Sequence, residues 1–334
     1  MATVIPFKRR IGILSHASVG GREERQGPLG TRFDHTDESA MFGQNTFEDA
    51  EGEMQRIALS LALKKGDMRP EALSLLVAGD LQNQCVASAN GLYSFGIPFL
   101  GLYGACSTCA EGLLTLSLAI SEGTVRRGAA VTSSHNAAAE RQFRLPLEYG
   151  GQRTPSASWT ATAAGAFILG DKGKFRIREG IVGKLIDGAT KDSSNMGAAM
   201  APAAADTILS YHLHGSVPLS EVDLVVTGDL GRVGRELLLS LLSKEGLSLA
   251  EKHRDCGLLI YEEGGEDFHS GASGCGCSAS VLSACLLPAM ERGEYKRILF
   301  LSTGALMSPQ STLQKHDILG IAHGVLIERE DDLC

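Results

Sequence analysis

Long hydrophobic runs are absent from this sequence of 334 residues. No segment approaches the roughly 18 uninterrupted apolar residues of a membrane helix. The basic residues at positions 8–10 are not followed by the apolar region of a signal peptide, because Ser15, His16 and Ser18 interrupt it. We therefore expect a chain that begins in the cytosol and has no membrane span of its own.

Aromatic residues, cysteines and positive charge are also scarce. Aromatics make up 5% of the residues, and 31 Lys and Arg stand against 39 Asp and Glu, which gives a net charge of −8. A negative chain without a long basic run is not expected to bind nucleic acid. The eight cysteines are too few for a disulfide scaffold, and in the cytosol they are expected to stay reduced.

Glycine is the residue in excess. It accounts for 40 of the 334 residues, well above the usual ~7%. This excess predicts many tight turns and close approaches of the backbone. The 43% of apolar residues are enough for a buried core, which excludes global disorder, and the length predicts two domains or two fused halves.

Short apolar runs alternate with longer amphipathic runs along the chain. This alternation is typical of an α/β fold, and we expect its central strands to be largely parallel. Strands are predicted at 10–15, 73–78, 98–101, 129–133, 165–169, 175–182, 222–227, 297–302 and 322–328, and helices at 46–65, 81–92, 106–120, 203–213, 234–242 and 278–291.

The alternation also contains an internal repeat. Three pairs of segments recur in the same order, and Cys106 is as far from Ser133 as Cys275 is from Ser302. We infer a duplicated α/β unit, with an N-terminal half at 1–171 and a C-terminal half at 172–334. Ligands are expected where the carboxyl ends of the strands of both halves meet. The paired segments are 77–81 and 226–230, 104–108 and 273–278, and 132–134 and 301–303.

Cys106 is the sharpest single candidate for chemistry. It lies among small residues at a predicted turn from a strand into a helix. The positive end of the helix dipole is expected to lower the pKa of a thiol in this position, as in a nucleophile. The alternative is a small buried cysteine that packs at the start of the helix.

Polar residues follow the strand that ends near residue 133. Ser133, Ser134, His135 and Asn136 leave a buried strand consecutively, which is costly unless they are solvated or used in binding. A locally hydrogen-bonded turn explains them equally well.

The connection at 136–160 that follows is long enough to be a lid or an interface. Its Arg141 and Arg144 face an anionic ligand if the segment is helical, or else pair with Glu140 or Glu148 on a solvated face.

The cysteine pairs do not predict a metal site. Cys106 with Cys109, and Cys275 with Cys277, lie at strand-to-helix junctions, and a Cys-x-Cys spacing is poor for a closed tetrahedral site. A zinc site completed by His269 and a redox Cys-x-x-Cys are therefore both disfavoured. We expect no metal and no cofactor held by the protein itself.

Gly-Ala-Cys106-Ser-Thr in a duplicated α/β chain resembles the thiolase and ketoacyl-synthase superfamily. That resemblance implies thiolase-like halves related by a pseudo-twofold axis, in αβαβα layers. Longer segments are similar to the stage V sporulation protein AD (SpoVAD) family, and they extend over most of the chain. They are residues 78–84, 104–108, 132–152, 199–208, 227–230, 256–261, 273–279, 302–309 and 321–328.

The resemblance implies a function as well as a fold. The SpoVAD family implies binding of dipicolinic acid (pyridine-2,6-dicarboxylate), with calcium entering only as part of the ligand, and uptake of this acid into the developing spore. It also implies other SpoVA membrane proteins as partners, and a place in the forespore cytoplasm or at the spore inner membrane that is reached through those partners. Thiolase-like folds usually pair, which implies a homodimer.

The resemblance finally implies a degenerate thiolase site. Cys106 occupies the nucleophile position, while the loop after His269 is one residue shorter than its thiolase counterpart and lacks its proline. Ser302 lies where a thiolase has its second cysteine, so the general acid is missing and a binding protein is favoured over an enzyme. The alternative is an acyltransferase or condensing enzyme that uses Cys106. The expected ligand-binding residues are Cys106, Ser133, Ser134, His135, Asn136, Arg141, Arg144, His269, Ser302 and His323.

Overall fold

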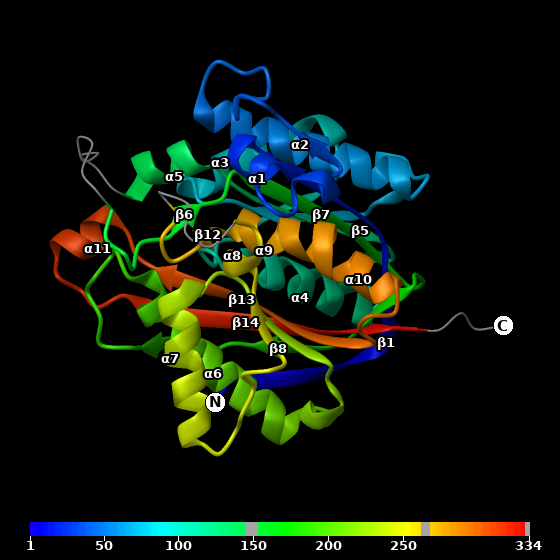
Figure 1. Cartoon of the computed structure of the whole chain (residues 1–334). Coiled ribbons are helices and arrows are strands. Elements are labelled where there is room, and N and C mark those ends of the chain that lie inside the picture. The colour runs from blue at the N-terminus through cyan, green and yellow to red at the C-terminus, as the bar shows by residue number, and fades with distance from the viewer. Residues whose placement is uncertain (144–152, 262–267, 331–334) are drawn as a thin grey trace.

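The chain folds into alternating layers of helices and sheets. A computed structural model describes residues 1–143, 153–261 and 268–330. Helices α2 (Phe47–Lys65) and α3 (Val86–Leu92) form one outer layer, and α6 (Met196–His214) and α7 (Gly231–Lys244) form the other (Figure 1). Between the two layers of strands lie α4 (Thr108–Ser121), α9 (Cys275–Val281) and α10 (Leu287–Glu291). The predicted αβαβα layering is confirmed.

Each half contributes five main strands with the same topology. In the first half the spatial order is β4-β3-β5-β7-β1, and in the second it is β11-β10-β13-β14-β8. The first two pairs in each order are parallel and the next two are antiparallel. The strands are β1 (Thr3–Gly20), β3 (Leu75–Gly79), β4 (Phe99–Gly101), β5 (Gly128–Ser134), β7 (Ala163–Gly170), β8 (Phe175–Val182), β10 (Leu224–Thr227), β11 (His253–Asp255), β13 (Arg297–Leu306) and β14 (Leu319–Arg329).

The expectation of largely parallel central strands is wrong. The parallel pairs lie toward the two ends of the path, and the strands at its centre, β7, β1, β8 and β14, are all antiparallel to their neighbours. Helices cover both faces of these strands, so their sequences are apolar on both sides whatever their direction. The sequence pattern therefore predicts burial correctly and does not distinguish the direction.

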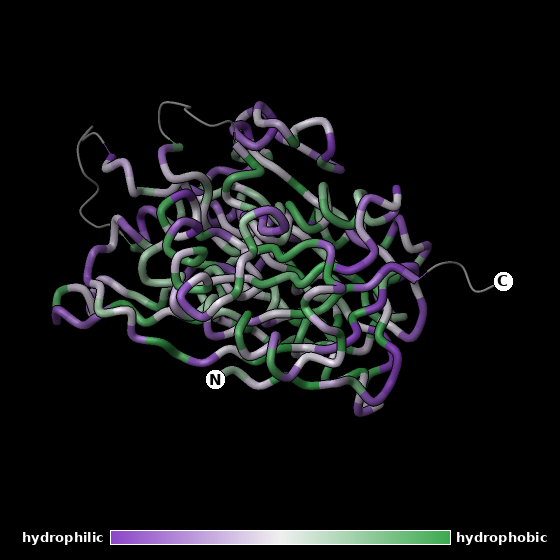
Figure 2. The backbone as a smooth tube through the Cα atoms, turned by 60° about the horizontal axis from the view of Figure 1, so that its bottom comes forward, coloured by the Kyte–Doolittle hydropathy of each residue, from purple (hydrophilic) through white to green (hydrophobic). Residues whose placement is uncertain are grey.

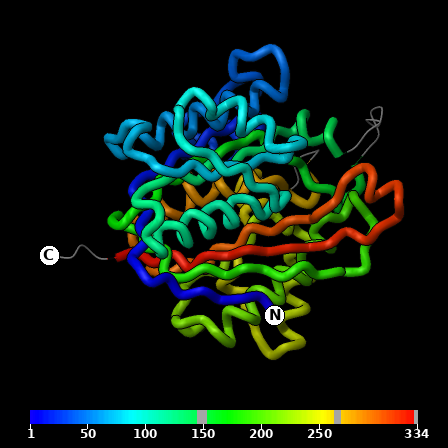
Figure 3. Tube along the Cα trace, turned by 180° about the vertical axis from the view of Figure 1, so that it is seen from behind, coloured from blue at the N-terminus to red at the C-terminus, as the bar shows by residue number. Residues whose placement is uncertain are grey.

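Strand β1 joins the two halves. Its residues Thr3–Ile13 pair with β8, and its residues Gly12–Gly20 pair with β7. Figure 3 shows β1 beside β8 and β14 at its N-terminal end, after which it climbs toward the other layer. The two layers of strands are therefore one hydrogen-bonded sheet, with β1 as the shared strand.

Short elements complete the described chain. Three of the predicted helices differ clearly from the structure. The one expected at 203–213 begins earlier, at Met196, and contains Pro202. The one expected at 81–92 begins only at Val86, because Gln84 and Cys85 have positive φ angles of 58° and 53°. The one expected at 278–291 begins at Cys275 and contains a π-helical turn, Leu282–Leu286, just before Pro288. The short elements are α1 (Arg22–Gln26), β2 (His35–Thr36), α5 (Asn136–Phe143), β6 (Trp159–Thr160), β9 (Ile186–Asp187), α8 (Cys256–Leu259), β12 (Ala272–Ser273), α11 (Pro309–Leu313) and 3-10 turns at Gly30–Arg32, Pro70–Ala72, Asn83–Cys85, Tyr93–Phe95 and Leu219–Glu221.

The main core lies between the two layers of strands. Figure 2 shows hydrophobic segments inside and hydrophilic loops outside. Leu113, Phe167 and Phe300 are all buried in this central core. Glycine allows the layers to approach: a Cβ on Gly165 would lie 2.7 Å from the Ala279 backbone, and one on Gly276 would lie 2.2 Å from the Ala163 carbonyl oxygen. Part of the glycine excess therefore serves the contact between α9 and β7.

Candidate functional site

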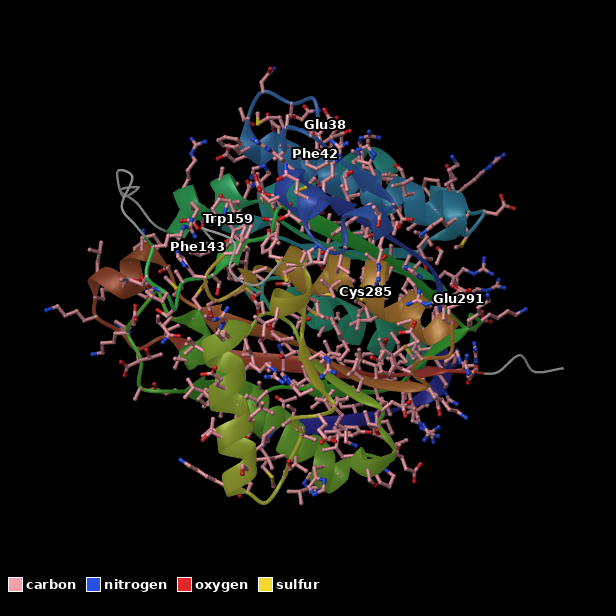
Figure 4. All side chains as sticks on the ribbon, viewed as in Figure 1. Glu38, Phe42, Phe143, Trp159, Cys285 and Glu291 are labelled. Carbon is pink, nitrogen blue, oxygen red and sulfur yellow. The ribbon has the colours of Figure 1, made fainter. Side chains whose placement is uncertain are left out.

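A small pocket of about 40 Å³ lies where the carboxyl ends of strands from both halves meet. Its walls are mostly apolar, as in many small-molecule sites. Figure 4 labels Phe143 at this side of the molecule. The lining residues are Leu81, Ala105, Cys106, Ala139, Glu140, Phe143, Thr160, Ser193, Met196, Ser273, Ala305 and Met307.

Cys106 reaches the pocket from a strained turn. Ala105 before it has a positive φ of 51°, which a residue with a Cβ seldom adopts. The turn is held by hydrogen bonds from Ser107 Oγ to the Gly104 carbonyl, at 2.6 Å, and from Thr108 Oγ1 to the Ala105 carbonyl, at 2.7 Å. A Cβ on Gly304 would lie 2.4 Å from the Gly104 oxygen, so β13 of the other half packs directly under this turn.

The Cys106 thiol lies close to the Asp229 carboxyl, which follows β10 and interacts with the thiol electrostatically. Asp229 accepts hydrogen bonds from Thr303 Oγ1 at 2.7 Å and from the Gly274 amide at 2.9 Å. Burial raises the pKa of Asp229 to about 7. Burial and then the Asp229 charge raise the pKa of the Cys106 thiol well above its usual value. The expectation of a lowered thiol pKa is therefore wrong, since these two effects outweigh the helix dipole.

The three candidate histidines lie away from the pocket. His135 is buried with Nε2 3.0 Å from the Ala40 carbonyl oxygen, and burial lowers its pKa. In His323, Nδ1 accepts a hydrogen bond from the Gly183 amide at 3.1 Å, and burial lowers the pKa to about 4. His269 is half-buried. Within the described ranges, no histidine lines the pocket.

Ser133 and Ser134 are buried behind the pocket and make hydrogen bonds within the protein. Ser133 Oγ donates to Glu51 Oε1 at 3.0 Å and accepts from Gln55 Nε2 at 2.7 Å. Ser134 Oγ donates to the Ala161 carbonyl at 2.7 Å. These serines are satisfied by partners that are distant in the sequence.

The other candidates are also engaged elsewhere or lie outside the described residues. Ser302 Oγ donates to Ser278 Oγ at 3.1 Å and accepts from the Ala110 amide at 3.2 Å, which ties β13 to α4. The backbone N–H of Asn136 donates to Thr162 Oγ1 at 3.0 Å, while its side-chain Nδ2 is buried without a hydrogen-bond partner among the described residues. Arg141 pairs with Glu48 at 3.3 Å on the surface, and Arg144 lies outside the described residues. Of the ten candidates, Cys106 lines the pocket, and a part for the others in ligand binding stays a prediction.

A buried acidic network lies behind the first half of the pocket. Glu51 Oε2 accepts a hydrogen bond from Gln82 Nε2 at 2.8 Å, and Asp80 Oδ2 accepts one from Ser88 Oγ at 2.6 Å. Burial, followed by the nearby Asp80 charge, raises the pKa of Glu51 to about 8. Asp80 and Asp229 occupy equivalent places in the two halves, as the repeated Val-x-Gly-Asp-Leu predicts. This repeat was the available signal for Asp229, which the sequence analysis did not select.

The outer rim of the pocket carries an ion pair on an aromatic platform. Arg153 pairs with Glu140 at 3.2 Å, and its guanidinium lies 4.9 Å from the ring centroid of Trp159. Trp159 in turn packs edge-on against Phe268. Figure 4 labels Trp159 and Phe143 on the same side of the molecule. The pocket therefore has both a cation and a carboxylate at its edge.

The thiols in the described part of the chain do not form a metal site. The seven described cysteines are free, and the described ranges contain no group of three or more His, Cys, Asp or Glu that is placed to hold a metal ion. In the same ranges, no helix has the length and apolar content that crossing a bilayer requires.

Comparison with known sequences gives a match over nearly the whole chain. The profile of the family described as Stage V sporulation protein AD (SpoVAD) matches residues 2–328. Stage V sporulation protein AD from Bacillus subtilis (strain 168) is 40% identical over 324 residues, which cover 97% of this chain and 96% of that protein.

Comparison with solved structures gives the same fold at low sequence identity. The cerulenin-bound OleA of Xanthomonas campestris has a TM-score of 0.62 at 14% identity and covers 96% of this chain and 99% of its own. The 3-oxoacyl-acyl-carrier-protein synthase III from Aquifex aeolicus VF5 has a TM-score of 0.60 at 14% identity and covers 95% and 99%. The thiolase-like fold expected from the sequence is confirmed.

Proposed function

Since this chain belongs to the stage V sporulation protein AD family, we propose that its pocket binds dipicolinic acid without reacting with it, for uptake into the developing spore. Family membership makes it a sporulation protein, and the fold is that of thiolase-like condensing enzymes. The single observation that carries the non-catalytic reading is the buried Asp229 carboxyl beside the Cys106 thiol, whose charge raises the pKa of that thiol.

This contact keeps the thiol protonated. A cysteine nucleophile attacks as its thiolate, and it usually relies on a neighbouring base or cation to lose its proton. Here the neighbour is a carboxyl whose pKa of about 7 lies below that of the thiol, so the proton stays on sulfur. The described lining residues include no histidine that could take the proton from the thiol.

The walls of the pocket suit a flat aromatic acid. Phe143, Met196 and Met307 offer apolar and polarisable surface for a pyridine ring. The hydroxyl groups of Thr160, Ser193 and Ser273 are the polar groups that orient a ligand in such a site.

The charge of the pocket supports an anionic ligand that carries calcium. Helices α4 and α6 both begin beside the pocket, and the positive ends of their dipoles favour carboxylates there. Glu140 lines the pocket beside its ion-pair partner Arg153, so this edge offers a carboxylate to a calcium ion and a cation to a ligand carboxylate. Glu140 is also the kind of oxygen ligand that calcium takes in its shell of six to eight oxygens.

Assembly and location form part of the same proposal. We place the protein in the forespore, at the spore inner membrane through other SpoVA proteins, and as a homodimer because thiolase-like folds usually pair. Light scattering after size exclusion tests the dimer, and a mass near the 35.3 kDa of one chain contradicts it.

Titration calorimetry with dipicolinate, with and without calcium, tests the binding site. Phe143→Ala removes an apolar wall and is expected to weaken binding about tenfold. Tyr93→Ala, at a side chain that is 80% exposed and outside the pocket, is the matched control. No saturable binding by the unmodified chain, or equal effects of the two substitutions, would overturn the assignment.

An acyltransferase or condensing enzyme is the second candidate. The observation in its favour is the strained turn at Ala105, which presents Cys106 at the start of α4 as a nucleophile would be presented. Incubation with acetyl-CoA, followed by mass spectrometry of the Cys106 peptide, separates the two candidates. An acylated Cys106 supports the enzyme and contradicts the non-reactive pocket.

A further inference from the structure

A basic patch lies at the end of the molecule opposite the pocket. It consists of residues 8–10 in β1, residues 64–72 after α2, residues 121–127 before β5 and residues 171–174 between β7 and β8. These segments lie at the ends of the strands that face away from the pocket, at the right of Figure 1. Figure 4 labels Glu291, the partner of Lys174, on this side and Phe143 on the other.

The patch is basic although the chain is acidic. Its four segments contain ten Lys and Arg against four Asp and Glu, while the whole chain has 31 against 39. Two of the segments, 64–72 and 121–127, have equivalents in the second half at 214–223 and 291–297. The two in the first half contain five Lys and Arg against three Asp and Glu, and their equivalents contain three against four. The duplicated fold therefore does not require the charge of these segments.

Much of this charge is available to a partner. Arg9, Lys64, Arg69, Arg126 and Lys172 are exposed, and their side chains enter no hydrogen bond or ion pair with other described residues. Other cations of the patch are paired, for example Lys8 with Glu122 at 3.0 Å.

The basic side chains form one continuous surface. The Arg9 guanidinium lies against Gly123, so β1 and the 121–127 loop share a border. Lys64, Arg69 and Arg127 line the same shallow depression, which connects this loop to the segment after α2. The Arg127 side chain also borders Gly170, next to the turn at 171–174. All four segments are therefore in contact.

The patch has few features of a protein or nucleic-acid interface. None of the exposed large hydrophobic side chains in the described chain belongs to it, whereas protein interfaces depend on buried apolar and aromatic anchors. It also presents no exposed aromatic ring for stacking on bases. Dispersed cations without apolar anchors suit a partner whose negative charge is spread over a surface.

We propose that the basic patch binds the surface of an anionic phospholipid bilayer. The contact is electrostatic and needs no inserted segment, because each exposed Lys or Arg near such a surface adds to the attraction. Phe143 of the pocket and Glu291 beside the patch lie on opposite sides of the molecule (Figure 4), so binding through this end directs the pocket away from the bilayer and toward the aqueous compartment. This contact is separate from dipicolinate binding and acts beside any protein partner.

Co-sedimentation of the full chain with vesicles tests the proposal. The chain is expected to bind phosphatidylglycerol vesicles and not phosphatidylcholine vesicles. Raising the ionic strength from about 0.01 M to about 0.1 M shortens the Debye length from about 30 Å to about 10 Å and is expected to release it. The triple variant Arg9→Glu, Lys64→Glu, Arg126→Glu is expected to bind roughly a hundredfold more weakly.

The matched control reverses the same amount of charge elsewhere. Lys184→Glu, Arg232→Glu, Lys244→Glu changes three exposed cations outside the patch and is expected to keep nearly all of the vesicle binding. Equal losses in the two triple variants, or equal binding to both kinds of vesicle, overturn the proposal. Binding of polyglutamate or duplex DNA through the patch, without vesicle binding, also overturns it and assigns the surface to that class of partner. Thermal unfolding confirms that both variants are folded.

Discussion

The Asp229 carboxyl of one half lies beside the Cys106 thiol of the other, and its charge raises the pKa of that thiol. The contact joins the two motifs that the sequence repeats, the acid after a strand and the cysteine before a helix. A protonated thiol beside a carboxyl therefore occupies the place where thiolase-like enzymes need a reactive thiolate. The chemistry of this pocket therefore depends on which group keeps the proton.

Asp229→Asn is expected to make Cys106 more reactive. The substitution removes the negative charge beside the thiol, so the thiol pKa falls, although burial still holds it above the usual value. The pH of half-maximal alkylation by iodoacetamide is expected to fall by roughly one unit. Asp80→Asn, at the equivalent place in the first half, serves as the control. The same alkylation profile for Asp229→Asn and the unmodified chain would refute the inferred contact.

Stability is expected to fall between about pH 6.5 and pH 8. Burial raises the pKa of Glu24 and Asp229 to about 7 and that of Glu51 to about 8, so the folded chain holds protons that the unfolded chain has released. His16 and His323, with pKa values lowered to about 4, act in the opposite direction only below the ordinary histidine pKa of 6.5. The free energy of unfolding is expected to drop by on the order of 1 kcal/mol per pH unit in this window.

Urea unfolding at pH 6.5 and pH 8 measures this drop. Glu51→Gln is neutral at every pH, so its stability is expected to depend less on pH than that of the unmodified chain. Glu53→Gln, on the same helix and paired with Arg56 at the surface, should keep the original dependence. A free energy of unfolding that increases across the window is the result that contradicts the prediction.

Gly304→Ala is expected to destabilise the junction of the two halves. The new Cβ would lie 2.4 Å from the Gly104 carbonyl oxygen and 3.1 Å from the Ser107 amide nitrogen. The cost is expected to be about 1–3 kcal/mol in the free energy of unfolding. Gly112→Ala in α4 is the control, because its Cβ would meet Ala130 at an ordinary 3.6 Å and alanine favours the helix by about 1 kcal/mol. Equal melting temperatures for the two variants would contradict the close approach.

Calcium is expected to strengthen dipicolinate binding through Glu140. Because the Glu140 carboxylate lines the pocket beside Arg153, its oxygens are placed to join the shell of a calcium ion that enters with the ligand. Glu140→Gln should reduce the gain from calcium about tenfold in calorimetry, since the charge is lost while the shape is kept. Glu48→Gln removes a carboxylate that pairs with Arg141 outside the pocket and should leave the gain intact. Affinity that is independent of calcium in the unmodified chain would rule out this role.

The fold was largely predictable because short sequence patterns that determine strands and turns occur in both halves. The recurrence of Val77–Leu81 as Val226–Leu230 predicts the equivalent strands β3 and β10, and the small residues around Cys106 predict its turn. The direction of the central strands was not predictable, since helices bury β7 and β14 on both faces in either direction.

The surroundings of the site were less predictable because they depend on distant partners. Ser133 and Ser134 suggested binding groups, yet Ser133 is hydrogen-bonded to Glu51, 82 residues away. The helix dipole suggested a reactive Cys106, yet Asp229 arrives from the other half and raises its pKa. Side-chain charge within a buried site is decided by such tertiary contacts, and local spacing does not contain them.

The position of β1 as the shared strand affects how the chain folds while it is being synthesised. Thr3 pairs with Val182 and Gly20 pairs with Ala163, so the two long neighbours of the first strand are synthesised long after it, while the short β2 pairs with its last two residues. At about 5–20 residues per second, β1 waits roughly 7–30 s for the first long neighbour. During that interval most of β1 is unpaired and open to aggregation, and the consecutive cations Lys8, Arg9 and Arg10 are residues of the kind that keep such a strand soluble.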